Sequence, residues 1–396
     1  MAASNKKIKV AICGSGIAGL SLLFGLLKHP HLEPILYEVG LEIAGDEGVG
    51  VGLAPNALRA LKLIDPELRE AVTRAGAGQG PNAGTEVVQV GDLKGDVGYL
   101  FQRSKFIEQL FKLVPQETCR TNKKLSRVED NSSGVGGDGV HSTVRKYILQ
   151  DDPSCAPIFS QQYFYVALVP MEEAKKKLPK ECFDVYCQYA WMGSGRGMLM
   201  HNPCNNGETL QLLAAFTTDE PWDPEKWTSE KSHDEMRKDL SSWGKTGEGF
   251  TELYEVQSTL LVRSIWEHPH APTYNSSHAC IIGDAAHAMQ PWQAGGAGQA
   301  IEDSMILQTL LGAIKDVPEI PSALDTYTKM QKERTQYVQT MSGGMGEILM
   351  GKGDADPDLE ELRKIVPRRW DEMWYFDLDK HQEEALKVMK ASIKST

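Results

Sequence analysis

The sequence of 396 residues lacks the features that define several classes of protein. Its seven cysteines are scattered without a Cys-x-x-Cys pair, which argues against a disulfide framework or a zinc site and suits a reducing compartment such as the cytoplasm. No hydrophobic run is long enough to span a bilayer, and residues 1–9 are too polar for a secretory signal. The net charge of −12 disfavours binding to nucleic acid or to an anionic membrane. A nucleophilic serine elbow, a metal cluster and a hydrolase-like carboxylate pair are also missing from the pattern.

The most informative feature that is present is a glycine motif near the N-terminus, Gly14-x-Gly16-x-x-Gly19. A short apolar β-run leads into it, an apolar helical stretch follows, and a second β-run ends on Glu38. In a dinucleotide-binding βαβ unit, the glycines allow a tight turn, close approach of a pyrophosphate and close helix–strand packing, while the acid binds ribose hydroxyls. The alternative is a plain glycine-rich turn. The strand, the helix and the spacing of the acid together favour binding of an adenine dinucleotide.

Two further motifs follow. Residues 283–303 read GDAAHAMQPWQAGGAGQAIED, so an apolar strand delivers Asp284 at its C-terminal end, the edge where open α/β sheets bind ligands. A helix that begins near Gly298 would direct backbone N–H groups into the same site. The alternative is a glycine-rich connection in which Asp284 only caps a helix. Residues 137–145, GDGVHSTVR, taken alone indicate a helix cap at Ser142 with Arg145 one turn later.

The order of these motifs, with Arg103 opening a helix between the first and the second, resembles the flavoprotein aromatic hydroxylases. These are single-component FAD-dependent monooxygenases with the p-hydroxybenzoate hydroxylase fold, and the fungal salicylate hydroxylase-like branch is the most similar. The resemblance covers about residues 9–384. It implies an α/β fold with a Rossmann-like FAD-binding domain, an inserted β-sheet substrate domain and a helical C-terminus.

The same resemblance implies an activity. FAD would be the cofactor and NAD(P)H the co-substrate, and the partners would be dioxygen and a small aromatic acid or phenol of salicylate-like or polyketide-derived type. The ring would be hydroxylated through a flavin C4a-hydroperoxide, with the protein carrying the substrate and the cofactor doing the redox chemistry. We expect a monomer or homodimer in secondary metabolism, with no metal, nucleic acid or membrane.

Six segments are expected along the chain. Alternating valines and glycines favour a hairpin before residue 99, and short β-runs between 158 and 216 indicate a separate sheet. After Ala300 the pattern is helical, with an expected break at Gly343–Gly344. The expected segments are FAD-binding parts at 1–75, 99–150 and 276–325, a substrate-domain hairpin at 76–98, the substrate domain at 151–275, and C-terminal helices at 326–396.

The resemblance assigns five residues to the cofactor. Glu38 would bind the adenosine ribose, and Arg103 would pair with the pyrophosphate or ribityl region. Asp284 would hold the ribityl chain. Gly52 would touch the flavin end, and Ala297 would offer its backbone to the isoalloxazine ring.

Further residues are assigned to the reaction. In the family, Pro291 borders the place where the hydroperoxide forms, and Asp138 is linked to both FAD and the reduced nicotinamide. Because phenolate is a better nucleophile than phenol, a base beside the substrate hydroxyl would help, and His201 and Tyr165 are candidates. Trp292 is the aromatic residue expected to line the pocket over the flavin.

Each of these candidates has an ordinary structural alternative. His201 could be a surface histidine beside a turn. His287, a third candidate base, could equally be a packed and hydrogen-bonded histidine. Most aromatic residues at such spacing belong to the core.

Two departures from the family pattern stand out. Only VEDNSSGVGGD occupies residues 128–138, where relatives have a hairpin and a buried apolar strand before the DG motif. We interpret this as an incomplete sequence, since a missing central strand would leave ladder groups unpaired; a natural deletion or a mis-spliced gene would give the same pattern. Tyr165-Val166 stands where several relatives have Tyr-Arg, so substrate choice does not transfer from the family.

Rival interpretations remain at this point. A halogenase or reductase of the same fold is one, although the WxWxIP pattern of tryptophan halogenases is absent. A non-catalytic or defective FAD-binding isoform is the other, prompted by the short segment before Asp138.

Overall fold

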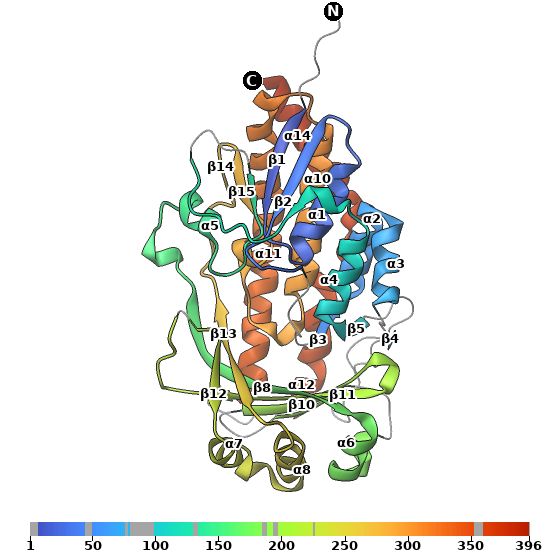
Figure 1. Ribbon diagram of the computed structural model, residues 1–396, viewed down its shortest axis with the longest axis vertical. Coiled ribbons are helices and arrows are strands. Elements are labelled where there is room, and N and C mark those ends of the chain that lie inside the picture. The colour runs from blue at the N-terminus through green and yellow to red at the C-terminus, as the bar shows by residue number, and fades with distance from the viewer. Residues whose placement is uncertain are drawn as a thin grey trace, which may run out of the picture.

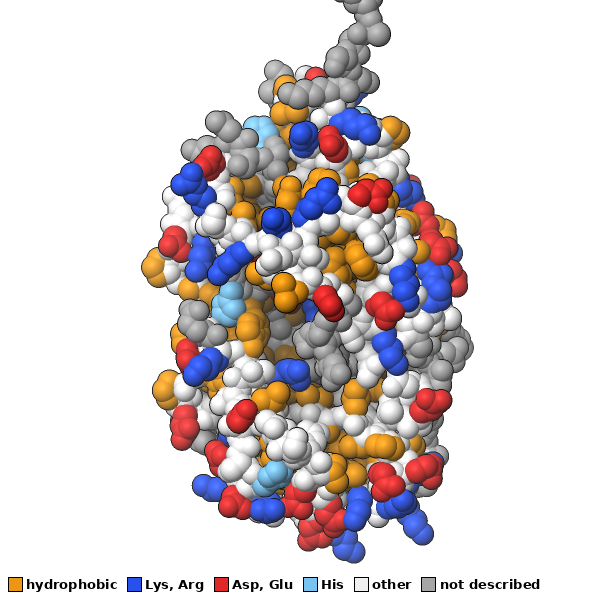
Figure 2. All heavy atoms as spheres, viewed as in Figure 1, with side chains coloured by type: hydrophobic (Ala, Val, Ile, Leu, Met, Phe, Trp, Pro, Cys, Tyr) orange, Lys and Arg blue, Asp and Glu red, His pale blue; other side chains and the backbone are white. Residues whose placement is uncertain are grey.

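The computed structural model describes residues 7–43, 50–75, 78–79, 99–129, 134–183, 188–192, 197–224, 226–351 and 359–395. Two six-stranded sheets lie at opposite ends of an elongated molecule, and the long helix α11 (Ile320–Leu349) runs between them (Figure 1). The face seen in Figure 2 is hollowed between the two sheets, with hydrophobic side chains in and around the hollow. Among the described residues, no helix is long and apolar enough to cross a membrane.

The first sheet contains the glycine motif. Alternate residues Ile8, Val10 and Ile12 of its strand β1 are buried, and helices α1 (Ile17–Leu27) and α10 (Gly296–Ala313) pack together in the same core. Helix α1 is apolar almost all round, as expected for a helix enclosed by the fold. The strand order is β14 (Asn275–Ser276), β15 (Ala279–Ile281), β7 (Gly134–Gly136), β1 (Ile8–Cys13), β2 (Leu32–Tyr37) and β6 (Cys119–Arg120).

The central position of this sheet is filled by the short strand β7. It pairs in parallel with β1 through Ala11–Cys13 on one side and with β15 on the other. The prediction that the strand before Asp138 is missing is corrected in part, because the GVG segment forms a short strand at this place. The strand has only three residues, and no described residue pairs with Ile8–Val10 on that side of β1.

The second sheet is antiparallel and carries helices on one face. In β8, residues Tyr163, Tyr165, Ala167 and Val169 are buried against a core that includes helices α6 (Met171–Lys177), α7 (His233–Leu240) and α8 (Gly244–Tyr254). These helices lie beneath the sheet in Figure 1. The strand order is β12 (Thr228–Lys231), β13 (Leu260–Glu267), β8 (Ile158–Pro170), β11 (Thr209–Thr217), β10 (Gly197–Cys204) and β9 (Tyr189–Met192).

A third, small sheet joins the two parts. Its order is β3 (Gly50–Leu53), β5 (Tyr99–Gln102) and β4 (Gly78–Gln79). Apart from β4, most of the hairpin predicted at 76–98 lies outside the described residues. The remaining helices are α2 (Pro55–Ile64), α3 (Pro66–Arg74), α4 (Arg103–Lys112), α5 (Thr143–Ile148), α9 (Asp284–His287), α12 (Leu359–Ile365), α13 (Asp371–Trp374) and α14 (Leu378–Ser395).

Helix α11 continues through Gly343–Gly344, so the predicted break there is wrong. The glycines of this segment serve close packing instead. A Cβ on Gly346 would overlap the indole of Trp292, and one on Gly344 would lie 2.7 Å from the guanidinium of Arg369. The helix therefore accepts the lower helical propensity of glycine so that bulky side chains can approach its backbone.

Candidate cofactor and active site

The glycine motif forms the turn that a dinucleotide site requires. Gly14 has φ +102°, and a Cβ there would overlap the carbonyl oxygen of Gly137. A Cβ on Gly19 would likewise overlap the carbonyl of Gly14, so the helix packs tightly on the strand. The N-terminus of α1 has no side-chain cap and no acidic residue in its first turn. Its free N–H groups are therefore available to an anion.

Arg103 lies beside this turn. Its guanidinium is 3.9 Å from where a Cβ on Gly16 would be, although the two residues are far apart in sequence. Arg103 opens helix α4, directly after β5, and is partly exposed. A cation over the free N–H groups of α1 is the arrangement that a pyrophosphate needs.

Glu38 follows directly after strand β2 and is held in place by its neighbours. It accepts hydrogen bonds from Ser15 N (2.8 Å), Ser15 Oγ (2.6 Å) and Gly40 N (2.8 Å). Partial burial alone would raise the pKa of this carboxyl, but the hydrogen bonds from Gly40 and Ser15 outweigh it and lower the pKa. The side chain is thus an ionised acceptor beside the glycine turn.

The opposite end of the site is formed by the GDAAH loop and the start of α10. Ala294 lies 3.4 Å from a Cβ on Gly52, so strand β3 faces this loop. Asp284 is exposed, and its Oδ1 is 4.0 Å from a Cβ on Gly296, the first residue of α10. Helix α10 has no side-chain cap, and Ala297 in its first turn is half-exposed. The structure brings Gly52, Asp284 and Ala297 to one edge, around a second uncapped helix start.

Asp138 has a different setting from the predicted one. Its carboxylate accepts hydrogen bonds from Ser142 Oγ (2.5 Å) and Thr143 N (2.8 Å), so it caps helix α5. Asp138 thus helps to cap α5 beside the N-cap Ser142, and its contact with FAD and nicotinamide stays a prediction. Arg145 on α5 is buried and donates to the carbonyls of Ala285 (3.1 Å) and Ala286 (2.9 Å). The DG motif thus holds the GDAAH loop in place through the hydrogen bonds of Arg145.

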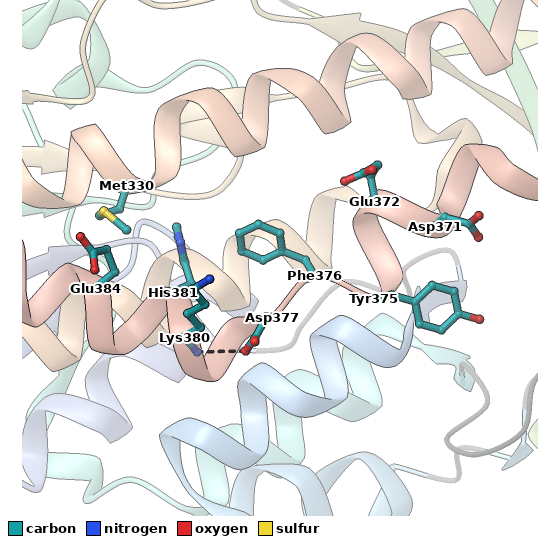
Figure 3. Close-up of a pocket in the computed structure, with 9 residues that line it drawn as sticks. All are labelled: Met330, Asp371, Glu372, Tyr375, Phe376, Asp377, Lys380, His381 and Glu384. Carbon is teal, nitrogen blue, oxygen red and sulfur yellow. Dashed lines mark hydrogen bonds between the residues drawn. The ribbon is translucent and has the colours of Figure 1, made fainter.

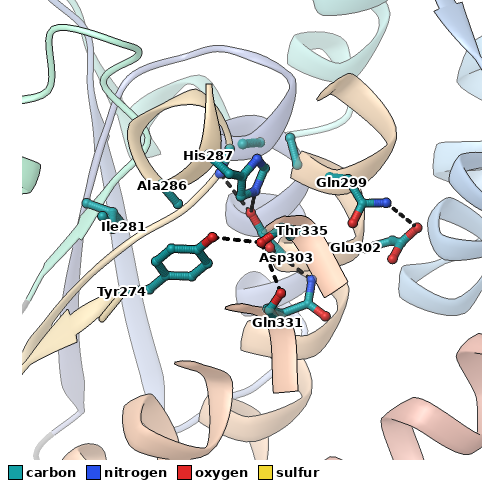
Figure 4. A network of polar contacts seen from close by, with 12 residues as sticks. Tyr274, Ile281, Ala286, His287, Gln299, Glu302, Asp303, Gln331 and Thr335 are labelled. Atoms are coloured by element: carbon teal, nitrogen blue, oxygen red, sulfur yellow. Dashed lines mark hydrogen bonds and ion pairs between the residues drawn. The ribbon is translucent and has the colours of Figure 1, made fainter. Parts of the chain in front are cut away.

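A buried polar network fixes the loop from the other side (Figure 4). Asp303 accepts from Gly283 N (2.8 Å), from His287 (2.7 Å) and from Gln331 of α11 (2.9 Å). Burial alone would lower the pKa of His287, but the neighbouring Asp303 carboxylate raises it. His287 is fully buried and bound to an acid, so its structural interpretation is the one that fits.

A second buried pair continues the network. Arg334 of α11 donates to both carboxylate oxygens of Glu302, at 2.5 and 2.9 Å, and Glu302 also accepts from Asn56 (2.7 Å) and Gln299 (3.0 Å). Further along α11, Ser342 donates to the carbonyl of Gln290 (2.6 Å). One face of α11 therefore holds residues 283–303 along their whole length. Sequence reasoning missed this helix as part of the site, although the polar residues of α11 recur at helical spacing.

The predicted bases His201 and Tyr165 lie on the wrong face of the second sheet. Tyr165 belongs to the core beneath the sheet, and its hydroxyl donates to Asp239 of α7 (2.7 Å). His201 is fully buried among Phe183, Tyr189 and Trp191, and burial lowers its pKa to about 4. Neither side chain can meet a substrate on the cofactor side, so both assignments are corrected.

Trp292 lies on the cofactor side but is mainly a packing residue. It is buried in a cluster with Met345 and Leu349 of α11, and its indole N–H is 3.0 Å from both Gln162 Oε1 of β8 and Gln290 Oε1. The adjacent Pro291 is exposed. Within this loop it is Pro291 and Ala294, rather than the indole of Trp292, that are open to a bound molecule.

A pocket of about 650 Å³ lies elsewhere, against the C-terminal helices (Figure 3). Its lining contains four carboxylates, two basic side chains and two aromatic rings, on Met330, Asp371, Glu372, Tyr375, Phe376, Asp377, Lys380, His381 and Glu384. None of these residues belongs to the motifs above, and an acidic lining repels an anionic ligand. The described residues contain no cluster that could hold a metal ion.

The two sheets and the converging glycine, acidic and arginine residues define a protein that binds FAD between a Rossmann-like sheet and a second antiparallel sheet. A family model described as an FAD binding domain matches residues 134–342. The 6-methylsalicylate 1-monooxygenase of Aspergillus terreus is 32% identical over 97% of this chain and 93% of its own. The salicylate hydroxylase of Pseudomonas putida is 28% identical over 97% and 95%. The chain belongs to the FAD-dependent monooxygenases of the salicylate hydroxylase type.

Solved structures agree on the fold. A salicylate hydroxylase in complex with its substrate superposes with a TM-score of 0.82 at 23% identity, covering 96% of this chain and 98% of its own. CtdE in complex with FAD and a substrate gives 0.78 at 18% identity, covering 98% and 100%. The predicted fold class and family resemblance are confirmed. The alignment to the Aspergillus relative spans 421 positions, more than the 396 residues here, so the relative carries internal residues that this chain lacks.

Proposed function

We propose that this protein hydroxylates an aromatic acid or a phenol with NAD(P)H and dioxygen, in the cytoplasm and as a monomer or homodimer. The observation that carries the proposal is an apolar sheet face opposite the exposed Pro291. On β8, Phe164 and Val166 are half-exposed and Leu168 is 37% exposed, whereas the alternate residues Tyr163, Tyr165, Ala167 and Val169 are buried. A flat apolar face beside a flavin site suits a planar ring. The relatives named for 6-methylsalicylate and salicylate support the same substrate class.

Each part of FAD would be bound by different residues of the site. The N-terminus of α1 and Arg103 would hold the pyrophosphate, Glu38 the ribose, and Asp284 the ribityl chain. The backbone at Ala297 would face the flavin ring. Bound FAD supplies the redox chemistry that no amino-acid side chain can, by taking electrons from NAD(P)H and activating dioxygen.

The protein contributes positioning and exclusion of water. Pro291, Trp292 and Gln290 fix the loop against β8, through the bond from Trp292 to Gln162. The apolar face of β8 would hold the aromatic ring against the cofactor side. Holding two reactants together in one complex makes a bimolecular reaction effectively unimolecular, and this effect accounts for a large part of enzymatic rate enhancement.

The short strand β7 favours a second candidate function. The three-residue strand and the shorter chain relative to the Aspergillus enzyme favour a protein that binds FAD without turnover. The DG motif and α5, which follow this strand, are nevertheless in place.

Flavin absorbance separates these functions. The purified protein should be yellow, and NADPH or NADH should bleach it faster when salicylate or another hydroxybenzoate is present. A hydroxylated product should then form in air. A yellow protein that no aromatic acid or phenol accelerates would support the non-catalytic function, and a colourless protein that takes up no FAD would refute the cofactor site.

A further inference from the structure

One cationic side chain shares the open apolar face of the second sheet. Arg263 of β13 is the direct cross-strand partner of Phe164 of β8, and directly opposed residues point to the same side of an antiparallel pair. The preceding pair, Val262 and Tyr165, points into the helix-covered core. Arg263 therefore projects from the same face as Phe164, towards the hollow between the two sheets. Blue side chains are visible at the margin of this hollow in Figure 2.

The surroundings of Arg263 leave its charge available. The side chain is half-exposed, and no hydrogen bond or ion pair joins its guanidinium to another of the described residues. Strands β8, β9, β10 and β11 contribute no Lys, Arg, Asp or Glu at all. The acid on β13, Glu267, is bound to Gln290 (2.9 Å), and Lys231 of β12 lies over the ring of Tyr163 on the helix-covered face. Glu230 of β12 is on the same face as Arg263 by register, and it is exposed. Within these strands, Arg263 is the one cation on an apolar face.

The distance between Arg263 and the Pro291 loop fits the size of a small aromatic molecule. Gln162, which binds Trp292 beside Pro291, lies on the same face of β8 as Phe164 and two residues before it. Two residues along a strand span roughly 6–7 Å, and the neighbouring strand is about 5 Å away. One ring over Phe164 can thus bring a carboxylate to Arg263 while its other edge faces the Pro291 loop.

We propose that Arg263 binds the carboxylate of an aromatic acid substrate, and so selects acids over neutral phenols. This inference rests on the proposed function, because it presumes that an aromatic substrate enters this hollow. A guanidinium offers a planar pair of donors that matches a carboxylate, and the apolar surroundings strengthen the attraction.

The test compares salicylate with its neutral analogue salicylamide on the FAD-loaded protein. Binding is followed by the change in flavin absorbance, so that the readout does not depend on turnover. Arg263→Gln should weaken salicylate binding about tenfold to hundredfold, the loss expected for a charge-assisted hydrogen bond, and should leave salicylamide within about twofold. Arg263→Lys should recover part of the salicylate affinity, since it restores charge without the planar fork.

The control is Arg127→Gln, which removes one positive charge from a side chain that is 79% exposed. It should leave both affinities unchanged. Equal salicylate affinity in Arg263→Gln and the parent would overturn the proposal while the proposed function stands. So would a parent that accepts only neutral phenols, or a variant whose KM rises for NAD(P)H and not for the acid. A parent that responds to no aromatic compound would overturn both.

Discussion

The buried pair of His287 and Asp303 should make the stability of this protein depend on pH in a window where few other groups titrate. The side chains are fully buried and 2.7 Å apart, and the carboxylate raises the pKa of His287 above its ordinary value of 6.5. Burial lowers the pKa of His201 to about 4 and that of His268 to about 3, so both are neutral above pH 6. His287 is therefore the buried histidine that changes charge above pH 6.5.

The direction of this pH dependence follows from the linkage between proton binding and folding. Below pH 6.5 the histidine is protonated in both states, and its stabilisation of the folded state is fully present. As the pH rises from 6.5 towards the raised pKa, the unfolded chain loses its proton first. The free energy of unfolding should then fall by up to about 1.4 kcal/mol per pH unit. With an m-value of about 3 kcal/mol/M in urea, the midpoint should drop by up to roughly 0.5 M per pH unit.

Urea unfolding at pH 6.5, 7.0, 7.5 and 8.0, followed by tryptophan fluorescence, measures this slope. His287→Gln keeps an N–H donor for Asp303 but has no proton to lose. The urea midpoint of this variant should therefore change less with pH over the same range. Subtracting the two curves removes the contribution of cysteine thiols, which both proteins share. His201→Gln is the matched control and should keep the parent's slope above pH 7, where this histidine is largely neutral in the folded and the unfolded chain alike. Identical slopes for the parent and His287→Gln would refute the reasoning.

Three further predictions concern single side chains. Glu38→Gln should weaken FAD binding about tenfold to hundredfold in a fluorescence titration without unfolding the protein, because a charge-assisted bond to the ribose is lost; unchanged affinity would remove Glu38 from the site. Arg334→Met should lower the free energy of unfolding by about 3–5 kcal/mol in urea, since Glu302 is left buried without its counter-charge; a loss below about 1 kcal/mol would contradict the assigned pair. Trp292→Ala should cost about 3–5 kcal/mol of stability, measured the same way, and should release hydrogen peroxide at the expense of product; normal stability with normal coupling would rule out both of its roles.

Local backbone demands made the cofactor half of the site predictable. The turn at Gly14 and the contact of Gly19 with the strand require glycine, whatever the rest of the fold does. Arg103 could be assigned because it opens a helix directly after a β-run in the family order of motifs. Its position beside Gly16 was a long-range contact that the sequence alone does not specify.

The substrate half depended on which face each strand residue occupies. Strand β8 has apolar or aromatic residues at nearly every position, so hydrophobic alternation could not separate Tyr165 from Phe164. A shift of one residue moves a side chain to the other face, and this decides between a packed tyrosine and a pocket residue. Asp138 differs from these strand residues, since an aspartate before a helix can cap the helix or bind a ligand, and the sequence pattern is the same for both.

Helix α11 also has a consequence for how the protein is made. Its side chains Gln331, Arg334 and Ser342 fix a loop that is synthesised some 40 residues earlier. A ribosome that has just completed the GDAAH segment therefore holds a chain whose cofactor loop still lacks its contacts from α11. The loop gains these contacts only after α11 has left the exit tunnel, so we expect firm binding of FAD to follow the synthesis of α11.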